Sequence, residues 1–278
     1  MENIRKDTTV IENIGKILLN TKRPLKERLR ALFTLRNIGG QMQDPLAVSK
    51  LESVLQDTTE EPIVRHEAAE ALAAIGEKSS LPLLRKYVND PCIEVAETCQ
   101  LGVQKMEESD ANESISLENP FHSVDPAVPL SKGSYNSINH LENILLDQSE
   151  PLYRRYQAMF SLRNMNSKES AIAIAKGLTC GSALFKHEIA YVLGQMQNDA
   201  TVKQLSQVLL DESEHEMVRH ECAEALGAIA TEECMEILNR YIKDEKRVVR
   251  ESCEVALDMC EYENSKEFQY ANALIKAV

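Results

Sequence analysis

The sequence has no tryptophan, and aromatic residues make up only 5% of its 278 residues. Surfaces that bind single-stranded nucleic acid stack bases on aromatic rings inside a basic groove. The formal net charge here is −13 at pH 7, which is the wrong sign for contact with phosphates. We therefore expect no nucleic-acid partner. An acidic surface instead favours a cationic substrate or protein partner.

Long apolar segments are also missing. The sequence contains no run of about 18 apolar residues, the length needed for a membrane span. The opening MENIRKDTTV lacks the apolar core of a secretion signal. The seven cysteines are odd in number, irregularly spaced and form no CxxC motif, which indicates free or buried thiols in a reducing compartment. We expect a cytoplasmic protein, with the nucleus as a second location, and no membrane partner.

The chain does contain an internal duplication. Residues 64–76 read VRHEAAEALAAIG and residues 218–230 read VRHECAEALGAIA, so ten of thirteen positions are identical at an offset of 154 residues. The offset extends beyond the motif, because it also pairs Asp90 with Asp244. The sequence therefore predicts two pseudo-symmetric halves.

A shorter period lies within the second half. Segments rich in Ala and Leu, with apolar residues three and four apart, recur about every 30 residues, at 153–165, 184–196, 218–230 and 248–259. This spacing is typical of amphipathic helices, and shorter helices are expected between them at 199–210 and 232–242. Strand patterns are almost absent. The predicted fold class is all-α, an α-solenoid of stacked helical hairpins.

Three regions are predicted along the chain. Residues 1–106 form an N-terminal half of about three repeats, and residues 137–278 form a C-terminal half of four. Between them, residues 107–136 are rich in Glu, Ser, Asn and Pro, which is typical of an acidic, polar linker. The halves differ in length because one repeat is missing near residues 38–41.

The gap is visible when matching motifs are compared. LRNM (162–165) and QMQ (195–197) are separated by 29 residues, whereas LRNI (35–38) and QMQ (41–43) are separated by two, a difference of 27. The absent stretch corresponds to 168–194. A solenoid can lose such a unit because each repeat contacts only its neighbours. An alternative isoform, a gene-model error and true divergence would all produce this gap.

Three His-Glu dipeptides recur at the same place, near the start of the second helix of a hairpin. Imidazole and carboxylate together, with no thiolate beside them, suit Fe, Zn or Mn. Equivalent helices of a solenoid line one surface, so we expect these residues to share it and to form a metal site: His66, Glu67, His187, Glu188, His220 and Glu221.

A structural role is the alternative for these dipeptides. The duplication could have copied a VRHE motif in which Arg65 and Arg219 pair with a glutamate of the neighbouring unit. Against this, the first and last units of the second half carry Tyr156 and Glu251 at the histidine position. The pairs are therefore confined to inner units, as a central site requires.

Other polar residues near the motifs have two interpretations each. Glu70 and Glu224 follow the pairs by one helical turn and could either hold the histidines in position or form structural ion pairs. The remaining histidines, His122, His140 and His215, are interpreted as solvated. Cys222, next to the third pair, is interpreted as a small core residue.

Six segments together carry a family resemblance: VRHEAAEALAAIG, FKHEIAYVLGQMQ, VRHECAEALGAIA, CGSALF, DPCIEVAETCQL and RVVRESCEVALDM. In their order and spacing they resemble the deoxyhypusine hydroxylase family. The resemblance implies HEAT-like repeats in two halves with a non-haem di-iron centre between them. It also implies a monomer that uses O2 to hydroxylate deoxyhypusine, a spermidine-derived lysine side chain, on one translation factor.

The family carries four His-Glu pairs, and three match here. By resemblance, His66 and Glu67 serve one iron, and a second iron is served by His187, His220 and Glu221. Glu188 then lies beside the metal and contacts the substrate amine. The fourth pair falls in the missing stretch, so we expect weak or mononuclear iron loading and low or no hydroxylase activity.

Two alternative functions are compatible with parts of the sequence. A non-catalytic HEAT-repeat scaffold that binds proteins on its concave face is a common role for solenoids. A repeat-built lyase acting on a tetrapyrrole-bearing protein is disfavoured, because no constellation of reactive cysteines is present. The recurrence of His-Glu pairs on inner units favours the enzyme over the scaffold.

Overall fold

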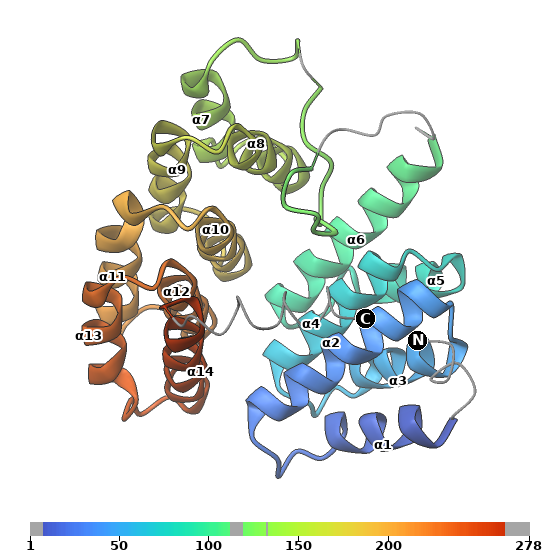
Figure 1. The fold of residues 1–278 in the computed structure, drawn as a ribbon. Helices are drawn as coiled ribbons and strands as arrows, with labels where there is room; N and C mark the ends of the chain where they lie inside the picture. The colour runs from blue at the N-terminus through green and yellow to red at the C-terminus, as the bar shows by residue number, and fades with distance from the viewer. Residues whose placement is uncertain (1–7, 112–118, 132, 265–278) are drawn as a thin grey trace, which may run out of the picture. The chain divides into compact units, whose positions relative to one another are not determined.

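The computed structural model describes residues 8–111, 119–131 and 133–264, and every regular element within these ranges is a helix. The predicted all-α class is therefore confirmed (Figure 1). The chain forms two compact units. Unit 1 comprises residues 1–135 with 149–160, and unit 2 comprises residues 136–148 with 161–278.

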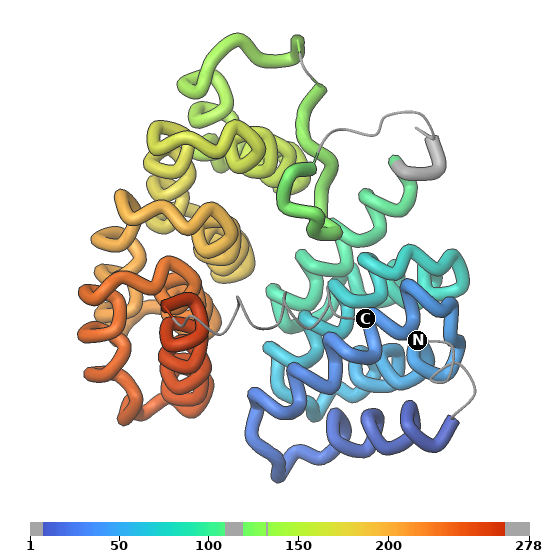
Figure 2. Tube along the Cα trace, in the orientation of Figure 1, coloured from blue at the N-terminus to red at the C-terminus, as the bar shows by residue number. Residues whose placement is uncertain are grey.

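Unit 1 contains three helical hairpins within the described residues, and Figure 2 shows each first helix turning directly into its second. A short 3₁₀ turn, Lys78–Ser80, precedes the third hairpin. The helices are α1 (Thr8–Leu18) and α2 (Leu25–Met42), α3 (Pro45–Gln56) and α4 (Pro62–Ile75), and α5 (Leu81–Tyr87) and α6 (Ile93–Ala111).

Unit 2 holds the remaining hairpins, and the first of them includes α8, whose residues up to Phe160 belong to unit 1. The short helices expected at 199–210 and 232–242 are present, the first of them beginning as a 3₁₀ turn. The helices are α7 (Ile138–Leu146) and α8 (Leu152–Met165), α9 (Lys168–Ala175) and α10 (Ala183–Met196), α11 (Val202–Leu210) and α12 (Glu216–Ile229), and α13 (Glu232–Tyr241) and α14 (Arg247–Asn264).

Local sequence sets the helix ends. The Asp44 carboxylate accepts hydrogen bonds from the first backbone N–H groups of α3, and the Ser182 hydroxyl does the same for α10, which satisfies donors that a helix start leaves unpaired. At the other end, Gly76 closes α4 with a φ of 71° and Gln197 closes α10 with a φ of 48°. A left-handed residue after the last turn is a common helix stop.

A buried cation ties each second helix to its surroundings. The Arg65 guanidinium of α4 donates to the carbonyl of Leu55 at the end of α3, and it binds Asp90 before α6 at 2.7 Å (Nη2 to Oδ2). In unit 2, Arg219 of α12 repeats both contacts, with Leu209 and with Asp244 at 2.6 Å. One side chain thus fastens its own hairpin and the next one, which explains why the arginines of the VRHE motifs recur.

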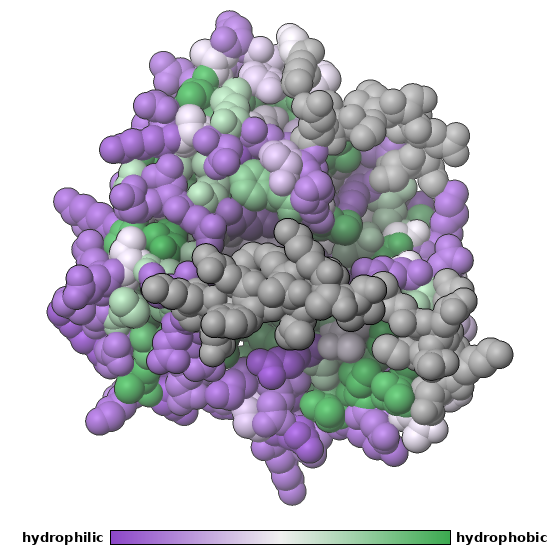
Figure 3. Space-filling model, in the orientation of Figure 1, coloured by the Kyte–Doolittle hydropathy of each residue, from purple (hydrophilic) through white to green (hydrophobic). Residues whose placement is uncertain are grey.

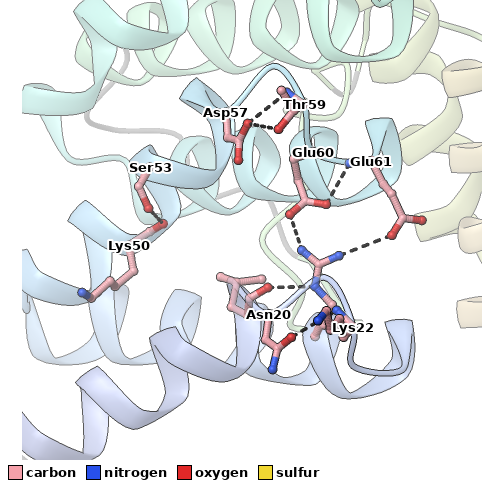
Figure 4. Close-up of polar contacts among 10 residues, drawn as sticks. Asn20, Lys22, Lys50, Ser53, Asp57, Thr59, Glu60 and Glu61 are labelled. Carbon is pink, nitrogen blue, oxygen red and sulfur yellow. Dashed lines mark hydrogen bonds and ion pairs between the residues drawn. The ribbon is translucent and has the colours of Figure 1, made fainter.

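The same arrangement extends to neighbouring hairpins with other residues. Arg28 of α2 donates to the Leu18 carbonyl at 2.8 Å and to the carboxylates of Glu60 and Glu61. Figure 4 shows Glu60 and Glu61 turned toward this guanidinium. On α10, Lys186 occupies the equivalent place and pairs with Glu214.

Neighbouring second helices approach most closely at glycines. A Cβ atom on Gly102 of α6 would lie 2.7 Å from the Ala73 Cβ of α4, and a Cβ on Gly227 of α12 would lie 2.7 Å from Ala256 of α14. The offset of 154 pairs Gly102 with Ala256 and Ala73 with Gly227. The two units therefore make the same close contact with the glycine on opposite partners.

Apolar side chains of both helices in each hairpin fill the interior, where Leu51, Leu72, Leu205 and Leu226 are fully buried. Over the described residues, the face drawn in Figure 3 is mainly hydrophilic, as expected from a chain with 27% charged residues. Among the helices of the described chain, none combines the length and apolar character needed to cross a membrane.

Candidate metal centre

Three of the predicted site residues meet in unit 2. His187 lies on α10, and His220 and Glu221 lie on α12, one repeat further along. The His187 Nε2 atom is 3.2 Å from Glu221 Oε2, and the imidazole centroids of His187 and His220 are 5.2 Å apart. One ligand atom from each of the three residues lies within 4.8 Å of the others. This spacing is suitable for a single shared cation.

The donor set itself fits a transition metal. Two imidazoles and one carboxylate are the ligands found at non-haem iron sites that keep open positions. All three side chains are buried, and the His220 Nε2 atom has no hydrogen-bond partner among the described residues. A buried polar atom without a partner is costly, so this nitrogen is a candidate ligand atom.

The other ring nitrogen of His220 faces α14 and its own helix. The Ser252 Oγ atom is 3.4 Å from His220 Nδ1 and donates a hydrogen bond to Glu224 Oε1 at 2.8 Å. Glu224 Oε1 is itself 3.6 Å from Nδ1. Burial alone would raise the pKa of Glu224, but the interaction with the adjacent His220 ring and the hydrogen bond from Ser252 outweigh it and hold that pKa below its ordinary value.

Glu188 is the fourth predicted residue in this part of unit 2. It follows His187 on α10, and only 3% of it is exposed. A carboxylate so deeply buried is uncommon unless it meets a cation or several donors. Its position next to His187, a candidate metal ligand, makes it a candidate for binding a cationic group.

Unit 1 holds the remaining pair. His66 on α4 is fully buried, and its Nε2 atom is 3.4 Å from Glu67 Oε1. Its Nδ1 atom is 3.5 Å from the Thr98 hydroxyl of α6. Glu70, one turn along α4, interacts electrostatically with Lys105 of α6. Within unit 1, the predicted site residues thus comprise one imidazole and one adjacent carboxylate.

The reason for the shorter ligand set is visible in α2. This helix begins like α8, since LRALFTLRNI matches YQAMFSLRNM, and it ends like α10, with Gln43 in a left-handed conformation (φ 51°) as at Gln197. The buried cation gives the register, because Arg28 of α2 and Lys186 of α10 pair with Glu60 and Glu214, which are related by the offset of 154. The residues that follow these cations are Leu29 and Arg30 in α2, and His187 and Glu188 in α10. The helix beside α4 therefore offers Leu29 and Arg30 where the helix beside α12 offers a His-Glu pair.

The structural interpretation of the VRHE motif accounts for its arginine but not for its His-Glu pair. That interpretation expected a glutamate partner for Arg65 and Arg219, whereas the observed partners are Asp90 and Asp244. The glutamates of the motif face imidazoles instead, because Glu67 lies beside His66 in unit 1.

The other polar residues singled out in the sequence are placed as follows. His122 and His215 are exposed, and His140 is half-buried; His215 caps α12 by accepting a hydrogen bond from Met217 N at 3.2 Å. Burial raises the pKa of Cys222 well above its ordinary value, so this thiol remains protonated inside the core. The seven cysteines are all free.

Sequence reasoning missed two hydroxyl residues, Thr98 and Ser252. Each lies beside the Nδ1 atom of a predicted site histidine, His66 or His220. The signal was available, because the offset of 154 pairs the two positions and both residues carry a hydroxyl group. It was overlooked because these residues lie 32 positions from their histidines.

Comparison with known proteins defines first the class and then the family. The HEAT-repeat family model matches residues 11–99 and 173–258, which identifies the hairpins as HEAT repeats. Deoxyhypusine hydroxylase of Drosophila melanogaster is 52% identical over 293 residues, covering 96% of each chain. The enzyme of Homo sapiens is 48% identical over 291 residues, covering 95% of each.

A solved structure agrees with these relatives. The structure of human deoxyhypusine hydroxylase in complex with glycerol has a TM-score of 0.80 and 48% identity, and the match covers 91% of this chain and 96% of that one. The chain belongs to the deoxyhypusine hydroxylase family. The predicted resemblance is confirmed, and with it the assignment of the chain to a family of hydroxylases.

Proposed function

We propose that this protein hydroxylates the deoxyhypusine side chain of the hypusine-containing translation factor, using iron and O2, and so completes hypusine formation. Family membership supports the reaction class. The observation that carries the metal dependence is the buried group of His187, His220 and Glu221 in unit 2, whose ligand atoms lie within 4.8 Å of one another. We place the enzyme in the cytoplasm, with the nucleus as a second location, as a monomer.

Each residue has a proposed role. His187, His220 and Glu221 would hold one iron, and His66 and Glu67 would contribute to a second. Bound iron would supply the activation of O2. Glu188 would receive the cationic amine of the substrate, because a buried carboxylate gives an ammonium group a charge-assisted hydrogen bond. The net charge of −13 would draw the cationic side chain toward the protein.

We further propose that the iron served by unit 1 is weakly held. The helix α2 carries Leu29 and Arg30 where α10 carries His187 and Glu188. The alignment with the Drosophila relative spans 293 positions, more than the 278 residues of this chain, so that relative has residues with no counterpart here. Loss of a direct ligand should reduce affinity at least as much as loss of a supporting residue, about 10- to 100-fold.

A non-catalytic HEAT-repeat scaffold is the second candidate. The observation in its favour is the same helix, α2, which replaces a ligand-bearing helix with one that stacks Arg36 on Phe33 at 5.4 Å. A scaffold requires the stacked hairpins but no metal. The two candidates therefore differ in a single measurable property, the iron content of the purified protein.

The test compares the chain with a version whose missing repeat is restored. In that version, a copy of residues 166–194 replaces Gly39 and Gly40, so that the first half regains a His-Glu pair. Both proteins are loaded with Fe(II) without oxygen, desalted and analysed for iron, and both are then assayed on a translation factor that carries deoxyhypusine.

We expect about one iron per chain and low turnover for the natural chain, with about two irons and higher turnover for the restored one. Iron in neither protein would support the scaffold and exclude the enzyme. Two irons and equal turnover in both would show that the fourth pair is dispensable, which would refute the impaired activity while leaving the reaction class intact.

A further inference from the structure

We infer that Thr98 and Ser252 are positioning residues that hold His66 and His220 in one neutral tautomer, with hydrogen on Nδ1 and a lone pair on Nε2. This inference rests on the proposed function, since it assigns the Nε2 lone pair to a metal. It concerns two residues on α6 and α14, the helices that follow each VRHE helix.

In unit 1 the hydroxyl group has a single hydrogen, and that hydrogen has a partner. Thr98 Oγ1 donates to the Glu94 carbonyl, one turn earlier on α6, at 2.7 Å. A hydroxyl oxygen that already donates can only accept from a second neighbour. The contact of 3.5 Å between Thr98 Oγ1 and His66 Nδ1 therefore requires the hydrogen to be on the imidazole.

Unit 2 reaches the same result with a different partner. Ser252 Oγ donates to Glu224 Oε1 at 2.8 Å, so it too can only accept at its contact of 3.4 Å with His220 Nδ1. The ordinary behaviour of a helical serine is to donate to a carbonyl one turn earlier. Ser252 turns to Glu224 instead, and this carboxylate lies 3.6 Å from the same Nδ1 atom. Two acceptors thus face the Nδ1 side of His220.

This assignment determines what each ring presents at its other nitrogen, Nε2. With hydrogen on Nδ1, a neutral imidazole presents only a lone pair at Nε2. In unit 1 that atom faces the Glu67 carboxylate at 3.4 Å, which places two acceptors against each other. Such a pair is favourable only when a cation or a shared proton lies with it. The contact between His66 Nε2 and Glu67 is therefore a pair of ligand atoms and not an ion pair, because the Thr98 hydroxyl keeps the imidazole hydrogen on Nδ1.

The duplication provides independent support. Positions 98 and 252 are related by the offset of 154, and so are positions 66 and 220. The residue type changed from threonine to serine between the copies, and the donor partner changed from a backbone carbonyl to a side-chain carboxylate. The hydroxyl oxygen beside Nδ1 is the feature common to both.

The first measurement reads the tautomer directly in the metal-free full chain. Two-bond ¹H–¹⁵N correlations of the imidazoles at mildly alkaline pH distinguish hydrogen on Nδ1 from hydrogen on Nε2, and His66→Ala and His220→Ala assign the signals. We expect Nδ1–H in both rings. The variant Thr98→Val should release His66 to a mixture of tautomers, and Thr98→Ser should restore Nδ1–H.

For His220, the neighbouring Glu224 can partly replace the lost hydroxyl. Ser252→Ala is therefore made alone and together with Glu224→Ala, and Ser252→Thr keeps the hydroxyl as the matched control. Co(II) is the metal probe, and its visible absorption during titration reports affinity without turnover. We expect Ser252→Ala to weaken Co(II) binding by about tenfold and the double variant by up to about a hundredfold, with Ser252→Thr close to the natural chain.

The outcomes separate this inference from the proposed function. Hydrogen on Nε2 in the natural chain would overturn the inference, and so would unchanged tautomers and unchanged Co(II) affinity in all hydroxyl-free variants. If Nδ1–H is found and is lost with the hydroxyl, the positioning role is upheld. Should the chain then fail to bind either Co(II) or Fe(II), only the metal-dependent function is refuted.

Discussion

The two units correspond in two helices that carry candidate site residues and differ in the helix beside them. Helices α4 and α6 of unit 1 correspond to α12 and α14 of unit 2 at the offset of 154, down to the buried arginine, its aspartate and the hydroxyl beside the histidine. The helix on the other side differs, because α2 stands where α10 stands in unit 2. The comparison separates what the hairpin stack needs from what the metal site needs.

The difference indicates that the hairpin stack of unit 1 forms without the helix that carries the candidate ligands in unit 2. In unit 1, α2 still provides Arg28 for the contacts with Glu60 and Glu61 and still ends with a left-handed glutamine. The structural functions of the helix beside α4 are therefore fulfilled. The helix offers no candidate metal ligands, however, because no His-Glu pair lies on α2. A site built from several repeats is incomplete when any one of them is absent.

The largest effect we predict concerns the buried ion pairs that both units share. Asp90→Ala leaves the Arg65 guanidinium, of whose side chain only 4% is exposed, without its carboxylate, and this should cost about 3–5 kcal/mol of unfolding free energy. Asp244→Ala should cost unit 2 a similar amount. Urea titrations followed by hydrogen exchange of peptides from each unit measure the two effects separately.

The control for this prediction removes both charges. Arg65→Met combined with Asp90→Asn takes away the buried cation and keeps an acceptor for Cys92 N–H, which Asp90 Oδ1 binds at 2.8 Å. It should recover much of the lost stability. The pair of Lys186 and Glu214 is more exposed, at 17% for each side chain, so Glu214→Ala should reduce the unfolding free energy by only about 1 kcal/mol. Equal losses at all three aspartate or glutamate positions would contradict this ordering.

The next effect tests the ligand sets of the two units. His220→Ala should weaken Fe(II) or Co(II) binding by about a hundredfold or more, because it removes one of two imidazoles from the unit 2 cluster. His66→Ala should change the total bound metal far less, if the iron served by unit 1 is weakly held as proposed. Metal content after desalting, combined with titration, checks both variants.

A matched control is available on the same helix. His215→Ser changes an exposed histidine at the start of α12 while keeping an acceptor for Met217 N–H. It should leave metal binding unchanged. If His66→Ala removed as much metal as His220→Ala, the proposed imbalance between the units would be wrong.

The third prediction concerns Gly102 and Gly227, which lie on opposite partners of the same helix contact in the two units. Gly102→Ala and Gly227→Ala each force a Cβ to within 2.7 Å of a neighbouring helix, and overpacking of this kind costs about 1–3 kcal/mol. In unit 1 the obstacle is the Ala73 Cβ, so Ala73→Gly should rescue Gly102→Ala. In unit 2 the Ala256 Cα and carbonyl oxygen also lie within 2.8 Å of the new Cβ, so Ala256→Gly should rescue Gly227→Ala only in part. Urea unfolding midpoints decide, and full rescue in both units would contradict the structure.

The repeat architecture could be predicted because its signals are local and periodic. The spacing of apolar residues in 218–230 indicates a helix without reference to any partner, and the offset of 154 exposes the duplication by identity alone. Likewise, the recurrence of His-Glu pairs at one place in the repeat identified the candidate ligands, because the same helical position faces the same side of a stack.

The residues around the ligands could not be found in this way. Whether Glu70 and Glu224 behave alike depends on their neighbours in the next hairpin, and the structure places Glu224 beside His220 and Ser252 while Glu70 interacts with Lys105. The structural alternative for the VRHE motif gave Arg65 a glutamate partner, whereas the observed partner is Asp90. Such contacts are set by the turn between hairpins and by side-chain direction, which the apolar period does not encode.

The smallest predicted effect compares two exposed turns, one in each unit. Hydrogen bonds from the Thr59 hydroxyl and backbone N–H lower the pKa of Asp57, and Ser213 lowers the pKa of Asp211 in the same way. Figure 4 shows the Asp57 carboxylate and Thr59 in contact. A carboxylate whose pKa is lower in the folded state adds stability above its ordinary pKa of 3.8, and this stability is lost as the pH falls through the lower, folded-state value.

Acidification should therefore loosen both turns together and at the same pH. Hydrogen exchange of the Thr59 and Ser213 amides, which both bind their aspartates at 2.9 Å, measures each turn separately between about pH 2 and pH 6. Asp57→Asn should flatten the pH dependence at Thr59 and leave Ser213 unchanged, with Asp211→Asn as the reciprocal control. Each turn meets the preceding second helix in the same way, because Glu60 pairs with Arg28 of α2 and Glu214 pairs with Lys186 of α10. Equal behaviour is therefore expected even though the candidate ligand sets differ. A turn in unit 1 that opened at a clearly higher pH would show that the lost repeat also weakened the hairpins that remain.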